Sequence, residues 1–110
     1  MKADFNMEEV ALSMLSALQG ELKKDWPAAK ATMESFMRRH QKIMEVEAIY
    51  RINGQLDEEN YKSRLEDKKR LMEAQLEAVK VVTKAMAQKA ANAAIEVLES
   101  AVLLALKGLI

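Results

Sequence analysis

The chain has 110 residues, no cysteine, and 17 basic against 17 acidic side chains. This length fits one domain, the lack of cysteine excludes disulfides and thiolate metal sites, and the balanced charge gives no overall attraction to nucleic acid or acidic membranes. Few Gly and Pro residues among abundant Ala, Glu, Lys and Leu favour long helices.

The first half of the chain predicts two helices, at about residues 7–24 and 27–53. Asn6 with Glu9 three residues later has the spacing of a capping box, which places the first helix start at Met7. Pro27 is the single internal breaker and suits the first turn of a second helix. The alternative is one continuous arm that is kinked at Trp26-Pro27.

The second half predicts one very long helix over residues 58–107. Asn53-Gly54 ends the preceding segment, Asp57 is the expected N-cap, and Leu56 with Tyr61 has the spacing of a hydrophobic staple. No Gly or Pro interrupts the chain before Gly108, and apolar residues recur at heptad-like intervals. Such a helix would be roughly 75 Å long. The expected seam is Leu65, Met72, Leu76, Val79, Thr83, Met86, Ala90, Ala93, Val97, Ala101 and Leu104.

The predicted fold is all-α, with residues 1–110 in a single helical domain. One arrangement is an elongated antiparallel helical hairpin whose first arm is kinked or broken at Trp26-Pro27. The other is a three-helix chain with one very long C-terminal helix. Both pack as a coiled coil or bundle, and the near-equal lengths of residues 7–53 and 58–107 favour the hairpin.

A polar layer interrupts the apolar face of the second helix. At 100° per residue, His40, Glu47 and Arg51 fall on the same side as Met33 and Met44. We interpret them as a structural layer that fixes register, with Glu47 and Arg51 forming an i, i+4 pair. The alternative is a small-ligand or metal site near His40 and Glu47, with Glu73 or Glu77 contributing from the long helix.

Catalytic and nucleic-acid motifs are missing from the sequence. It has one histidine, no phosphate-binding glycine loop and no nucleophile motif, so we predict neither an enzyme nor a bound cofactor. The basic clusters at 38–42 and 68–70 are interleaved with acidic residues, as on a solvated helix face. We therefore expect no nucleic-acid partner.

The C-terminal third is the most apolar part of the chain. Several apolar side chains fall outside the expected seam, and one arm of a hairpin could not cover them all. They predict a self-association surface: Ile95, Leu98, Val102, Leu103 and Leu106. Insertion into a membrane surface is the alternative, although Glu96 and Glu99 interrupt this segment and lysines are scarce.

Together these patterns predict a non-enzymatic structural, assembly or adaptor protein that acts by helix–helix self-association and by binding other helical proteins. Eight methionines suit adaptable packing surfaces. A ligand-binding bundle and a peripheral membrane protein are the alternatives. The first residues do not have the pattern of a signal peptide, and no stretch reaches the roughly 20 apolar residues of a membrane span. We therefore expect a cytoplasmic homo-oligomer.

Overall fold

The computed structural model describes residues 5–108, which are mostly helical and contain no strand. This confirms the all-α prediction. The described residues form four α-helices and one short 3-10 turn. They are α1 (Met7–Leu22), η1 (Lys23–Asp25), α2 (Trp26–Ile52), α3 (Glu58–Glu77) and α4 (Lys84–Gly108).

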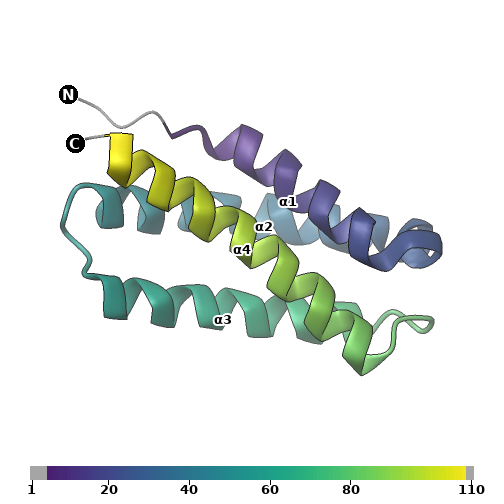
Figure 1. The fold of residues 1–110 in the computed structure, drawn as a ribbon. Coiled ribbons are helices and arrows are strands. Elements are labelled where there is room, and N and C mark those ends of the chain that lie inside the picture. Colours follow the sequence, from purple (N-terminus) through teal and green to yellow (C-terminus); the bar gives the residue numbers. More distant parts are fainter. Residues whose placement is uncertain (1–4, 109–110) are drawn as a thin grey trace.

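The four helices form an up-down-up-down bundle in which sequence neighbours run antiparallel (Figure 1). Helix α4 contacts each of the other three, whereas α1 and α3 occupy opposite corners and do not touch. The body measures 45 × 23 × 20 Å with a radius of gyration of 14.0 Å. That radius is close to the ~13 Å of a compact 100-residue domain.

The chain folds back at η1, so residues 7–53 do not form one straight arm. Helix α1 ends at Leu22, and Lys23 takes a positive φ of 52° while its N–H bonds to the Gln19 carbonyl. Helix α2 then begins at Trp26, with Pro27 in its first turn as predicted. The long-hairpin arrangement is therefore wrong. The predicted break between two helices is correct, and it lies at Lys23–Asp25, directly before Trp26-Pro27.

The predicted single helix over residues 58–107 is also wrong, because the chain breaks between Glu77 and Lys84. Four β-branched residues lie close together there, at Val79, Val81, Val82 and Thr83, and such side chains lose rotamer freedom in a helix. The Thr83 Oγ1 atom accepts a bond from the Met86 N–H at 3.1 Å, which makes Thr83 the N-cap of α4. A capping side chain and a β-branched run thus end a helix that contains no Gly or Pro.

The other helix ends confirm the capping predictions. The Asn6 side chain accepts from the Glu9 N–H at 3.2 Å, and the Asp57 side chain accepts from the Asn60 N–H at 2.7 Å. Gly54 has a φ of 81°, the left-handed conformation expected after the end of α2. Local sequence therefore determines where α1, α2 and α3 begin or end.

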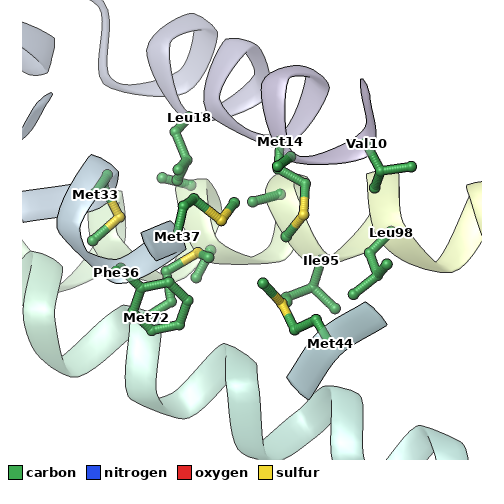
Figure 2. Packing of buried hydrophobic residues seen from close by; sticks show 14 of the residues in the cluster. Val10, Met14, Leu18, Met33, Phe36, Met37, Met44, Met72, Ile95 and Leu98 are labelled. Carbon is green, nitrogen blue, oxygen red and sulfur yellow. The ribbon is translucent and has the colours of Figure 1, made fainter. Parts of the chain in front are cut away.

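The core contains most of the methionines. Figure 2 shows their side chains packed between the helices, together with Phe36, Leu18 and Leu98. The fully or nearly fully buried methionines are Met7, Met14, Met33, Met37, Met44 and Met72. They fill the interior of the bundle, so they give no support to an adaptable methionine-rich binding surface.

Alanine allows α4 to lie close to its neighbours. Ala87, Ala90, Ala91 and Ala94 have no exposed surface at all. Side chains of this size let helix axes approach, and α1 makes its most extensive contact with α4. The contact between α1 and α2 is much smaller.

Candidate functional site

The polar layer predicted in α2 exists, but its partners come from α3. Glu47 is 6 % exposed, and its Oε1 accepts from the Lys68 ammonium at 3.0 Å. Its Oε2 accepts from the Arg64 guanidinium, also at 3.0 Å. The expected i, i+4 pair with Arg51 is not formed, because the Glu47 carboxylate is turned toward α3. Both oxygens of this buried carboxylate are therefore satisfied by cations.

His40 lies beside this layer and does not enter it. Its ring centroid is 4.3 Å from that of the fully buried Phe36, and the rings are tilted by 40°. Desolvation lowers the pKa of His40, and the nearby Arg39 and Lys68 cations lower it further. The imidazole is therefore neutral at pH 7, with an aromatic neighbour on one side.

These surroundings do not form a metal site. Among residues 5–108, no three His, Cys, Asp or Glu side chains lie close enough together to hold a metal ion. The carboxylate that was expected to contribute, Glu47, is already occupied by two cations. The alternative of a metal near His40 and Glu47 thus has no support from this geometry.

Three of the five residues predicted to form an oligomer surface are core residues. Ile95, Leu98 and Val102 are at most 7 % exposed within the single chain. The prediction that they need a partner chain is wrong, since α1, α2 and α3 already cover them. Leu103 is 51 % exposed and Leu106 is half-buried, so only these two remain accessible.

The break between α3 and α4 explains this error. The expected seam was continued through it, which selected Val97, Ala101 and Leu104 as inward positions. In the structure Leu104 is instead 69 % exposed, while Leu98 and Val102 face the core. A non-helical segment changes the rotational phase of all that follows, and a side chain moves by about 100° per residue.

The least complete seam of the bundle lies between α1 and α2. Two adjoining hollows of about 450 and 500 Å³ run along it and share Leu12, Leu15 and Glu34. Leu12 is 67 % exposed, and Leu15 is partly buried against the core. We call this feature the α1/α2 groove. Its other lining residues are Glu8, Ala11, Ser16, Gln19, Trp26, Pro27, Lys30, Met37, Arg38 and Gln41.

A second concave feature lies where α2 ends, α3 begins and α4 ends. It is a cavity of about 240 Å³, which we call the C-terminal cup. Val102, Leu103 and Leu106 form its apolar side. Its polar lining residues are Arg51, Glu58, Tyr61, Lys62 and Glu99.

The basic clusters make contacts within the chain. Lys68 is buried against Glu47, Lys69 lies 3.2 Å from Glu66, and Arg39 donates to the Gln75 amide oxygen at 3.1 Å. The contacts of Lys68 and Arg39 join α2 to α3, whereas the pair of Lys69 lies within α3. No helix among residues 5–108 is both long and apolar enough to cross a membrane.

No family model, curated protein or solved structure that was compared with this chain matches it. Functional inference therefore rests on its own geometry.

Sequence reasoning missed both concave features. Leu12 was assigned no role, although it projects outward from α1. A helical wheel gives the signal, because Leu12 lies about 160° from the buried Met14. Tyr61 was read only as part of a helix-start staple. Its proximity to Arg51 and Glu99 depends on how three helices meet, which no local pattern in the sequence encodes.

Proposed function

We propose that this protein is a non-enzymatic assembly module that self-associates through the α1/α2 groove. The observation that carries the proposal is the exposure of Leu12, which is 67 % exposed between two hollows. An exposed leucine is ordinary when it stands alone. Here it lies along a groove of mixed polar and apolar lining, beside the partly buried Leu15, and such a concave surface can accept another helix.

The charges around the groove favour a second copy of this chain as the occupant. Two acidic residues, Glu8 and Glu34, and two basic residues, Lys30 and Arg38, line it. None of the four has an ion-pair partner within residues 5–108. A rim with equal numbers of both signs has no net charge to repel a second copy, and a symmetric dimer brings the same patch of both subunits together.

The apolar content of the groove also suits a helical partner. Leu12 and Leu15 are spaced i, i+3, so they form a short apolar stripe on α1, in which Leu12 is exposed and Leu15 is partly buried against the core. Across a two-fold axis, the stripe of one copy would insert between α1 and α2 of the other. This places the interface away from Leu98 and Val102, which are already buried.

Spin labels test this placement, since the chain has no cysteine of its own. Exposed serines are available on three helices for nearly isosteric substitution: Ser16, Ser63 and Ser100. Ser16 lines the groove, whereas Ser63 lies on α3, at the corner opposite α1. The variants S16C, S63C and S100C are labelled singly and measured by pulsed electron paramagnetic resonance.

We expect a defined intermolecular distance for S16C that is shorter than the distances for S63C and S100C. A shorter distance for S100C would place the contact on α4 and contradict the groove. No intermolecular coupling in any of the three would contradict self-association itself.

A further inference from the structure

The C-terminal cup is lined by polar groups that have no partner among residues 5–108. The Tyr61 hydroxyl is buried and has no hydrogen-bond partner within the described part of the chain, and the whole residue is only 5 % exposed. Buried hydroxyls nearly always have a partner, because an unpaired one loses its bonds to water without replacement.

Two charged groups of the cup also lack an ion-pair partner within the described part of the chain. Arg51 and Glu99 both line the cup, and neither has an ion-pair partner within 4.0 Å among residues 5–108. They are not paired with each other. The other two charges of the cup, Lys62 and Glu58, lie 3.4 Å apart and are satisfied. Counting residues 5–108 alone, the cup therefore has one free cation and one free carboxylate, with the buried phenol of Tyr61 in the same lining.

The remaining wall is apolar and the space is small. Val102, Leu103 and Leu106 line it, and the cavity volume is about 240 Å³. An apolar cavity of about 150 Å³ already admits benzene. The cup therefore has room for one short aliphatic or aromatic group with a compact polar head.

We propose that the C-terminal cup binds a free α-amino acid with an apolar side chain. The carboxylate of such a ligand accepts from the Arg51 guanidinium and the Tyr61 hydroxyl, its ammonium donates to the Glu99 carboxylate, and its side chain lies against Val102 and Leu106. A zwitterion is the head group that uses both unpaired charges. A fatty acid would bring a second negative charge close to Glu99, and an alkylamine would leave Arg51 without an anionic partner.

The state of Tyr61 agrees with this arrangement. Burial raises the pKa of the Tyr61 phenol, and the Glu47 and Glu99 carboxylates raise it further. The hydroxyl therefore keeps its proton through the whole neutral range and remains a donor. The cup shares no residue with the α1/α2 groove, so this inference does not depend on the proposed self-association.

Isothermal titration calorimetry with L-leucine, carried into the millimolar range, is the direct test. Two analogues dissect the head group: 4-methylpentanoate lacks the ammonium, and 3-methylbutylamine lacks the carboxylate. We expect L-leucine to bind and each analogue to bind at least about tenfold more weakly, because each loses a hydrogen bond to a charged group.

Variants then assign the contacts. R51Q and E99Q should each weaken L-leucine binding by at least about tenfold, and Y61F by about two- to tenfold. K42Q, on an exposed lysine far along α2, is the matched control and should bind like the parent. Y61F removes a hydroxyl that has no partner among residues 5–108, so it should fold at least as stably as the parent, as checked by circular dichroism. No binding of L-leucine, or binding that E99Q and R51Q leave unchanged, would overturn the proposal. Equal binding of 4-methylpentanoate would overturn the zwitterion assignment.

Discussion

Helix α1 has two very different sides. On one side it packs closely on α4, where four alanines without any exposed surface allow the two helices to approach. On the other side its contact with α2 is smaller, and a groove with Leu12 at its edge remains between the two helices. One side of α1 is therefore fully packed within the chain, and the other side leaves a groove. That groove is where we propose that a partner chain binds.

Helix α2 shows the same contrast. Its contact with α3 is closed by the buried Glu47 carboxylate and the cations on either side of it. Its contact with α1 has charged residues along it too, but Glu34 and Arg38 make no ion pair within residues 5–108. The buried carboxylate between α2 and α3 is thus paired with cations, whereas Glu34 and Arg38 along the α1/α2 groove have no ion-pair partner among residues 5–108.

Removing the Glu47 carboxylate from the contact between α2 and α3 should have the largest effect on stability. Glu47→Leu leaves the Lys68 ammonium, whose side chain is 10 % exposed, without its partner. Breaking a buried pair in this way costs about 3–5 kcal/mol. The half-exposed Arg64 can turn to water, so most of the loss should come from Lys68. Denaturant titration measures it.

The double variant E47L/K68L is the control, because it removes both buried charges together. It should recover much of the lost stability. If E47L alone is as stable as the parent, the ion pair is not a structural part of the α2–α3 seam.

Substitutions at two leucines of α1, one on each side, compare the two sides of the helix directly. Leu18 is fully buried and Leu12 is 67 % exposed. Leu18→Ala should lower the free energy of unfolding by about 2–5 kcal/mol through lost contacts and a cavity. Leu12→Ala should change it by less than about 0.5 kcal/mol when measured at low concentration, where chains are separate. Similar losses for both variants would mean that α1 packs against α2 in solution more closely than described.

Removing the N-cap of α4 should have a smaller effect on stability. Thr83→Ala removes the oxygen that accepts from the Met86 N–H, and loss of such a cap costs about 0.5–2 kcal/mol. Ser100→Ala, at an exposed position in the middle of α4, should cost less than about 0.5 kcal/mol. If T83A is as stable as the parent, residues 58–107 have no cap at this position and the break has another cause.

The smallest expected effect is a pH dependence from His40. Its pKa is lowered in the folded protein by desolvation and by Arg39 and Lys68, so the unfolded chain takes up a proton more readily. The stability from this group is therefore present above the unfolded pKa of about 6.5 and is lost as pH falls through that value toward the folded pKa. His40→Gln should flatten the dependence of stability on pH in this window. An unchanged slope would assign the dependence to other groups.

Sequence patterns predicted what is local in this fold. The caps at Asn6 and Asp57 and the left-handed Gly54 depend on a few neighbouring residues, and each of these predictions was correct. The all-α class follows from composition and apolar periodicity. Glu47 was also placed correctly on an inward face.

The errors came from assuming that residues 58–107 form one continuous helix, and from contacts between helices that no local pattern in the sequence encodes. Thr83 was counted as a seam residue, and its role as an N-cap depended on the chain breaking there. Once the phase was wrong, Leu98 and Val102 were taken for surface residues. The partners of Glu47 came from another helix, which only the way the helices pack could decide. The meeting of Arg51, Tyr61 and Glu99 is likewise a product of tertiary packing.

Sedimentation equilibrium on three proteins tests the central claim most directly. Leu12 on the groove and Leu104 on α4 are almost equally exposed, at 67 % and 69 %, so Leu12→Lys and Leu104→Lys make a matched pair. We predict a dimer for the parent chain, the 12.4 kDa monomer for L12K, and an unchanged dimer for L104K. A monomeric parent at high concentration, or a dimer that L104K dissociates and L12K does not, would contradict assembly through the α1/α2 groove.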